Sequence, residues 1–227
     1  MSDSLFSELS LLETRVLGVL VEKQHTVPDT YPLTLNAVMI GCNQKSSRDP
    51  VIEASQRDVQ DAVDRLKHLS FVSEVSGGRV VRYMHHVEKV LQIPMPSAAL
   101  LAILMLRGPQ TAGELRINSE RLHRFADISS VESFLVELTE RSAGGLVTEL
   151  PRQPGARENR WMHLLSGTPK IEIDRRAEAG SIRYMEQAEA DSEIAGLKAE
   201  VTRLGIEVSE LRRLVNKLCQ RCNVMDA

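Results

Sequence analysis

The side chains with the clearest chemical potential in this sequence are ones that could bind nucleic acid. Between Cys42 and Pro50 the chain reads Asn-Gln-Lys-Ser-Ser-Arg-Asp. Amides and hydroxyls can donate to phosphate oxygens or base edges, and lysine and arginine neutralise phosphates. The candidate set also draws on a predicted helix and two predicted hairpins: Asn43, Gln44, Lys45, Ser46, Ser47, Arg48, Arg57, Arg65, Lys67, Arg79, Arg82, Arg152, Arg157 and Arg160. A solvated loop and two ordinary hairpins explain the same residues without any ligand.

Patterns typical of catalysis or metal binding are missing from the sequence. Cys219 and Cys222 form a CxxC pair, but zinc needs four ligands and the chain holds no second pair. Two such pairs brought together in a parallel dimer could share a metal, whereas the simpler interpretation makes Cys222 a small apolar helix residue. The six histidines show no HExxH spacing, and the chain has no GxSxG and no phosphate-binding glycine loop. We therefore predict a protein that is not an enzyme and has no metal site and no cofactor.

A repeat positions the candidate residues. Two stretches end alike, in Arg82-Tyr83-Met84-His85 and in Arg160-Trp161-Met162-His163. Before each lie the patterns of an apolar helix, a short second helix, an amphipathic third helix and a pair of strands. This order predicts a mainly α protein with small β wings, an α+β fold of two tandem winged helix-turn-helix domains at residues 1–92 and 97–166. Ile93–Pro96 is predicted as a linker that resists helix formation.

Serines followed three residues later by an acidic residue predict where helices begin. Ser10, Ser55 and Ser129 are the predicted N-caps. The first helix is expected to end near Lys23 and to present one apolar face to a core, formed by Leu12, Val16, Leu17 and Leu20.

The C-terminal region carries a heptad repeat. Residues 167–183 are predicted to be a linker, and residues 184–223 a coiled-coil helix. Valine and isoleucine at the a positions with leucine at d favour a parallel two-stranded coiled coil. The seam of this predicted homodimer is Ile194, Leu197, Val201, Leu204, Val208, Leu211, Val215 and Leu218. The alternative is a long amphipathic helix that packs on the domains of its own chain.

Composition limits the possible partners. The formal net charge is −3 and the isoelectric point about 6.1, so the chain is not a strongly basic nucleic-acid binder. The predicted third helix of the second repeat carries three glutamates against a single arginine, which opposes contact with phosphates. The longest apolar run, Ala98–Leu106, is about half of what crosses a bilayer. Three cysteines and no secretion signal favour the cytoplasm, with no membrane association.

The first half of the chain resembles a known family. The residues that carry the resemblance are Glu13–Lys23 (ETRVLGVLVEK), Thr30–Asn36 (TYPLTLN) and Cys42–Pro50 (CNQKSSRDP). They closely resemble the YceH-like family of bacterial proteins, and the resemblance extends over about residues 9–166. It implies two tandem winged-helix domains in a bacterial cytosolic protein of unestablished function, and it brings no catalytic residue and no ligand.

Two functions are consistent with the sequence. The first is a homodimeric DNA-associated protein, such as a transcriptional regulator, that uses the candidate residues above. The second is an interaction scaffold that binds a protein partner through tandem winged helices without DNA, which the acidic third helices and the isoelectric point favour.

Overall fold

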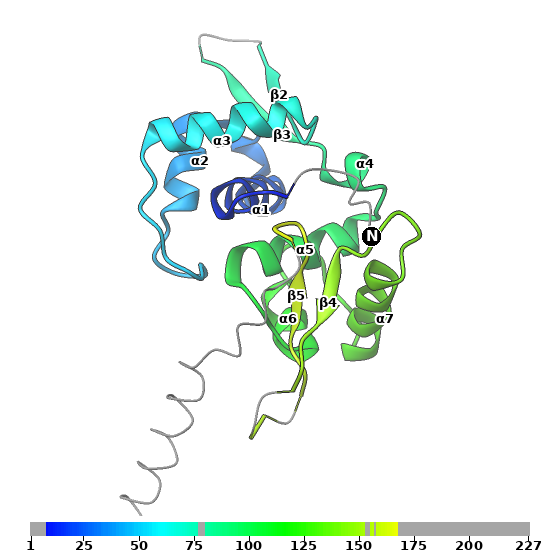
Figure 1. The fold of residues 1–227 in the computed structure, drawn as a ribbon. Coiled ribbons are helices and arrows are strands. Elements are labelled where there is room, and N and C mark those ends of the chain that lie inside the picture. Colours follow the sequence, from blue (N-terminus) through cyan, green and yellow to red (C-terminus); the bar gives the residue numbers. More distant parts are fainter. Residues whose placement is uncertain (1–7, 77–79, 153–154, 157, 168–227) are drawn as a thin grey trace, which may run out of the picture. The chain divides into compact units, whose positions relative to one another are not determined.

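The fold is built from two copies of one order of elements. The computed structural model describes residues 8–76, 80–152, 155–156 and 158–167. The first copy contains α1 (Leu11–Thr26), a 3-10 turn (Pro28–Thr30), β1 (Leu33–Thr34), α2 (Leu35–Cys42), α3 (Gln56–His68), β2 (Val72–Val75) and β3 (Arg82–His85). Its strands form an antiparallel sheet in the order β1-β3-β2 (Figure 1).

The second copy follows after a short helix, α4 (Val87–Leu91). It contains α5 (Met95–Arg107), α6 (Ala112–Asn118), α7 (Ile128–Thr139), β4 (Val147–Glu149) and β5 (Trp161–His163), with β4 and β5 paired antiparallel. The predicted α+β class is therefore confirmed for the described residues. The predicted linker beyond Gly167, the coiled-coil helix and its seam from Ile194 to Leu218 lie outside them.

The two copies correspond residue by residue around the first strand. Leu33 of β1 pairs with Tyr83, and in the second copy Gln110 pairs with Trp161 through a two-way backbone bridge. The next residue is a threonine in both copies, and it caps the following helix through its hydroxyl. The repeated Arg-aromatic-Met-His motif thus supplies the strand that pairs with this segment in both copies.

Helix starts follow the side chains that cap them. The capping boxes predicted at Ser10 and Ser55 are both present. The start predicted at Ser129 is wrong, because Asp127 caps α7 by accepting from the backbone N–H of Ser130 at 2.7 Å. An aspartate can thus cap a helix as a serine does, although the acidic residue that completes a capping box does not follow it three positions later.

The predicted helix-resistant linker Ile93–Pro96 is wrong in part, because Ile93 and Pro94 are not helical but α5 already begins at Met95. Pro94 is the N-cap of α5, and Pro96 lies in its first turn. Proline is compatible with a first turn because the N–H that it lacks has no partner within the helix there. The short helix α4 had no clear signal in the sequence.

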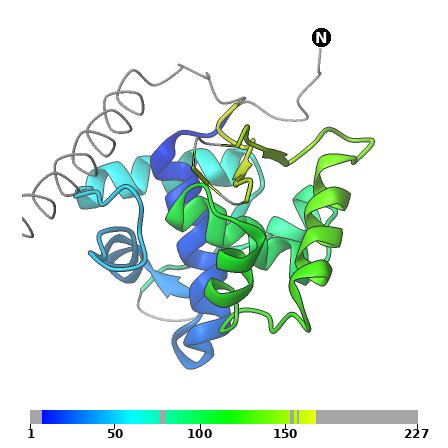
Figure 2. The same cartoon turned by 90° about the horizontal axis from the view of Figure 1, so that it is seen from below.

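Helices α1 and α5, the first helix of each copy, pack against each other and share one core (Figure 1). Every residue from Glu13 to Val21 is buried, as is every residue from Ser97 to Leu106. Figure 2 shows α7 on the side of these helices away from α2. The predicted single apolar face of α1 is therefore wrong, because α1 is covered by its own copy on one side and by α5 on the other.

Gly18 sets how closely these helices approach. A Cβ placed on Gly18 would lie 2.8 Å from Cγ of Leu106 and 3.3 Å from the carbonyl oxygen of Ala102. The ends of the described core also meet, since the backbone N–H of Leu9 donates to the carbonyl of Leu165 at 2.9 Å. None of the helices in the described ranges is both long and apolar enough to cross a membrane.

We expect Gly18→Ala to lower the free energy of unfolding by about 1–3 kcal/mol, because the added methyl group overpacks the α1–α5 contact. The matched control is Gly113→Ala in α6, where a Cβ would have no neighbour closer than 3.8 Å. That variant gains helix propensity without a clash and should be stabilised by about 0.5–1 kcal/mol. Urea denaturation measures both changes, and a Gly18→Ala protein as stable as its control would contradict the close approach.

Candidate nucleic-acid interface

Arg48, one of the two candidate cations between Cys42 and Pro50, points into the protein. Its side chain is fully buried, and Nη2 lies 2.6 Å from Oε2 of Glu22. Its remaining donors bind the carbonyl of Gly41 at 3.0 Å, the carbonyl of Ser47 at 2.8 Å and Oε1 of Gln44 at 2.6 Å. In this arrangement Arg48 holds the loop closed and cannot reach a phosphate.

The amides of the loop are also committed to its own structure. Asn43 donates to the carbonyl of Ala54 at 2.9 Å and accepts from the Ala54 N–H at 2.8 Å, as a second strand would. Ser47 accepts from Nη2 of Arg107 at 2.7 Å. Lys45 and Ser46 are left as exposed side chains of the candidate run.

Arg15 supports the same loop and was not among the candidates. It is fully buried in α1, and its Nη1 and Nη2 donate to the carbonyls of Cys42 at 3.2 Å and Pro50 at 2.7 Å. Burial lowers the pKa of this guanidinium, and its Nε has no partner within the described residues. The sequence signal for this role was a charge placed within an otherwise apolar stretch of helix.

The loop also fastens the first copy to the second. The backbone N–H of Asp49 donates to the carbonyl of Leu106 at 2.9 Å, at the end of α5. Together with the Arg107–Ser47 bond, this contact joins the Cys42–Pro50 segment to the shared core. The most distinctive run of the sequence therefore connects the two copies.

The cations of α3 are divided between ion pairs and solvent. Arg65 lies 3.3 Å from Glu13 through Nε and donates to the carbonyl of Glu8. Lys67 pairs with Asp64 at 3.3 Å and with Glu74 of β2. Arg57 is exposed at the start of the helix. Of these three candidate residues, Arg65 and Lys67 already bind acceptors of their own chain.

The arginines of the repeated motif make equivalent bonds in both hairpins. Nη1 of Arg82 donates to the carbonyl of Pro32 at 2.8 Å, and Nη1 of Arg160 donates to the carbonyl of Pro109 at 2.9 Å. These prolines directly precede Leu33 and Gln110, the residues that pair with the closing strands. Each arginine therefore fastens its hairpin to the segment before the second helix. Both side chains remain partly open to solvent.

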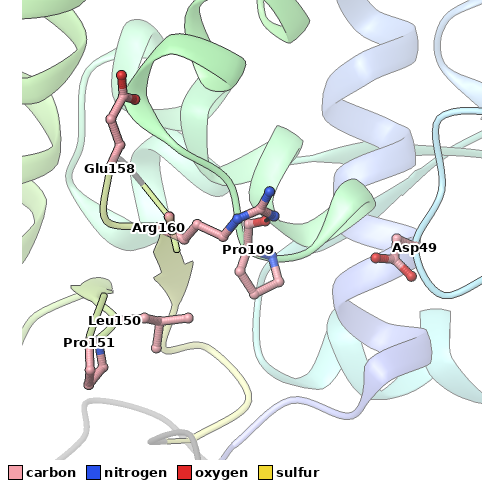
Figure 3. A pocket seen from close by; sticks show the side chains of 7 residues that line it. Asp49, Pro109, Leu150, Pro151, Glu158 and Arg160 are labelled. Carbon is pink, nitrogen blue, oxygen red and sulfur yellow. Dashed lines mark hydrogen bonds between the residues drawn. The ribbon is translucent and has the colours of Figure 1, made fainter. Parts of the chain in front are cut away.

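A small cavity lies beside Arg160, with a volume of about 180 Å³ (Figure 3). Figure 3 shows Arg160 over Pro109, with Asp49 of the first copy facing them and Glu158 directed away. This volume is below the roughly 300 Å³ at which ligand pockets begin. Nearby, Arg152 donates to the carbonyl of Ala156 at 2.7 Å, and the candidates Arg79 and Arg157 lie outside the described residues.

The histidines of the repeated motif are buried in the sheet of each copy. Nδ1 of His85 accepts from the Val87 N–H at 3.3 Å, so its Nε2 is assigned as the donor to Oε1 of Gln24 at 2.6 Å. Nδ1 of His163 has no partner within the described ranges. Burial lowers the pKa of both histidines to about 4. The described residues contain no group of three or more histidine, cysteine or acidic side chains that could hold a metal ion.

These features define an α+β protein assembled from two copies of one helix-and-hairpin unit. Residues 9–156 match the family described as "Protein of unknown function, DUF480", and the chain belongs to that family. A UPF0502 protein of Dechloromonas aromatica is 60% identical over 208 residues, which cover 92% of this chain and 94% of that protein. UPF0502 proteins of Burkholderia multivorans and Burkholderia lata are each 55% identical over 217 residues, covering 96% of this chain and 90% of theirs. The predicted membership in a bacterial family of unestablished function is confirmed.

We expect Arg48→Ala to lower the free energy of unfolding by about 3 kcal/mol, because it removes the hydrogen-bonded partner of the largely buried carboxylate of Glu22 and leaves it only the looser contact with Lys23 at 3.6 Å. Lys45→Ala, in the same loop but exposed, should change stability by no more than about 0.5 kcal/mol. Chemical denaturation of both variants tests this difference, and equal stabilities would mean that Arg48 does not hold the loop.

Stability should fall as the pH decreases from about 6.5 to about 4. Below 6.5 the unfolded chain binds protons at His85 and His163, whereas the folded protein, with pKa values near 4, does not. Each histidine then contributes a loss of up to about 1.4 kcal/mol per pH unit. Denaturation across this range should give a shallower slope for His163→Gln than for the wild type. Identical slopes would contradict the depressed pKa of His163.

Proposed function

We propose that this protein is a non-enzymatic interaction protein whose two copies are winged-helix units that bind a protein partner. The order of helices and strands and the β1-β3-β2 sheet support the winged-helix interpretation. The observation that carries the choice of partner is the use of the basic side chains: Arg48, Arg65, Lys67, Arg82 and Arg160 all bind acceptors within their own chain.

The third helices support the same choice. In a winged helix bound to DNA, the third helix approaches the major groove. Glu132 and Glu137 are exposed in α7 and Glu140 is exposed directly after it, whereas Arg141 donates to the carbonyl of Leu91. In α3, Asp58, Asp61 and Asp64 balance Arg57, Arg65 and Lys67, so this helix has no net positive charge. Phosphate contact by α7 would begin with charge repulsion, and α3 offers phosphates no net attraction.

Apolar exposure on the first hairpin also favours a protein partner. Val75, Val80 and Val81 are 36%, 58% and 42% exposed. Valines at the end of a hairpin give no hydrogen bonds to phosphates, whereas clustered exposed apolar side chains are typical of protein-binding surfaces.

Duplex DNA is the second candidate, favoured by the exposure of Lys45, Ser46 and Arg57. In either case the heptad segment from Ile194 to Leu218 is proposed to form a homodimer, so that two copies of each surface are presented together.

The deciding experiment uses the full-length protein in two assays. In the first, binding to random-sequence duplex DNA is measured at low and high salt; we expect no salt-sensitive complex. A complex that weakens steeply with salt and is lost in Lys45→Glu/Arg57→Glu would overturn the proposal in favour of DNA. In the second, pull-down after nuclease treatment should recover one stoichiometric protein partner. Light scattering with and without residues 185–227 establishes whether each sample is a dimer.

A further inference from the structure

Both copies expose an isoleucine at the same place. Ile40 of α2 is the sixth residue after the capping Thr34, and Ile117 of α6 is the sixth after the capping Thr111. Their exposed fractions are 57% and 70%, and Ile117 is the most exposed large apolar side chain in the described residues. A single exposed isoleucine is common on protein surfaces, but these two recur at equivalent positions of the two copies.

The surroundings of the two isoleucines differ in charge. Ile117 borders a small depression that is also lined by Arg116, Glu120, Arg124 and Phe125, and Arg121, which follows Glu120 in the chain, is exposed. In the first copy Met39 stands where the second copy has Arg116. The loop that follows α2 buries Arg48 and exposes Lys45 as its cation.

The Ile117 surface, defined as Arg116, Ile117, Glu120, Arg124 and Phe125, has a rigid base. Phe125 is 4% exposed and makes edge-to-face contacts with His123 at 4.6 Å and with Phe134 of α7 at 5.8 Å between ring centroids. Nη2 of Arg116 donates to the carbonyl of Ala126 at 3.3 Å, which fixes its guanidinium at the edge. Because Phe125 and Arg116 are already held in place, these side chains lose little conformational entropy when a ligand binds.

The acidic groups nearby offset the arginines only in part. The carboxylate of Asp127 is occupied at the start of α7, where it accepts from both the N–H and the hydroxyl of Ser130 at 2.7 Å. Glu120 and Asp127 are thus two carboxylates beside three exposed arginines at 116, 121 and 124, and the pKa of Asp127 is lowered by its bonds to Ser130 and further by Arg116. The surface therefore combines a protruding apolar side chain with excess positive charge.

We propose that the Ile117 surface binds an acidic peptide segment of a partner protein that contributes a bulky apolar side chain. The apolar side chain packs on Ile117 against the Phe125 base, while carboxylates on either side pair with Arg116 and Arg124. Duplex DNA fits this surface less well, because the apolar side chain of Ile117 lies at its centre. The exposed glutamates of α7, the next helix in the chain, would also repel phosphates. This inference rests on the proposed role in protein binding and names the chemistry of the partner.

The test is selection of short random peptides displayed on phage against the full-length protein. Wild type and Ile40→Ser should both enrich sequences in which aspartate or glutamate flanks leucine or an aromatic residue. Synthetic versions of the enriched peptides should bind Ile117→Ser and Arg124→Glu roughly ten-fold more weakly, a loss of about 1.4 kcal/mol. Ile40→Ser is the matched control, since it removes the equivalent exposed isoleucine from a surface without the three arginines.

Each other outcome counts against a defined claim. Enriched peptides that are basic, or that bind Ile117→Ser and Arg124→Glu as tightly as wild type, would overturn the Ile117 surface while leaving a protein-binding function standing. No enrichment by wild type would count against both proposals. Duplex DNA that displaces the peptides and depends on Arg124 but not on Ile117 would assign this surface to nucleic acid. All variants lie at exposed positions, and circular dichroism verifies that they are folded.

Discussion

The contact between α1 and α5 is the constraint on which the rest of the described structure depends. Each helix is the first of its copy, and each is buried along its middle on all sides. Because Gly18 lets the end of α5 approach α1 closely, the two copies share one core. The Cys42–Pro50 loop of the first copy then contacts the end of α5 in the second. The buried side chains of Arg15 and Arg48 hydrogen-bond to backbone carbonyls in and around this loop. The repeat is thus a single packed unit and not two independent modules.

The same arrangement explains where the positive charge goes. Loops that run over a shared core expose backbone carbonyls, and arginine satisfies several of them with one rigid side chain. Arg82 and Arg160 do this at equivalent places, and Arg15 and Arg48 do it within the loop. Positive charge used in this way is lost to phosphate binding. What is left for a partner is a mixture of apolar side chains and the arginines around Ile117.

Much of the fold followed from local sequence signals, whereas the environment of single side chains did not. The capping boxes at Ser10 and Ser55 and the repeated Arg-aromatic-Met-His motif gave the elements and their order, because they act within a few residues. The burial of α1 on both sides depends on α5, some eighty residues away, and no periodicity in α1 reports it. Arg48 looked like a surface cation because its partner Glu22 is distant in sequence. The equivalence of Ile40 and Ile117 depends on the threonine N-caps, Thr34 and Thr111, which occupy the same position in both copies.

The hydrogen bond between Leu9 and Leu165 places the two ends of the described core side by side. Neighbouring ends are what makes circular permutation of a domain possible. Evolution could therefore exchange the first and second copies, or insert sequence at an exposed hairpin, without rebuilding the interior. The chain also enters and leaves the core at one point on its surface.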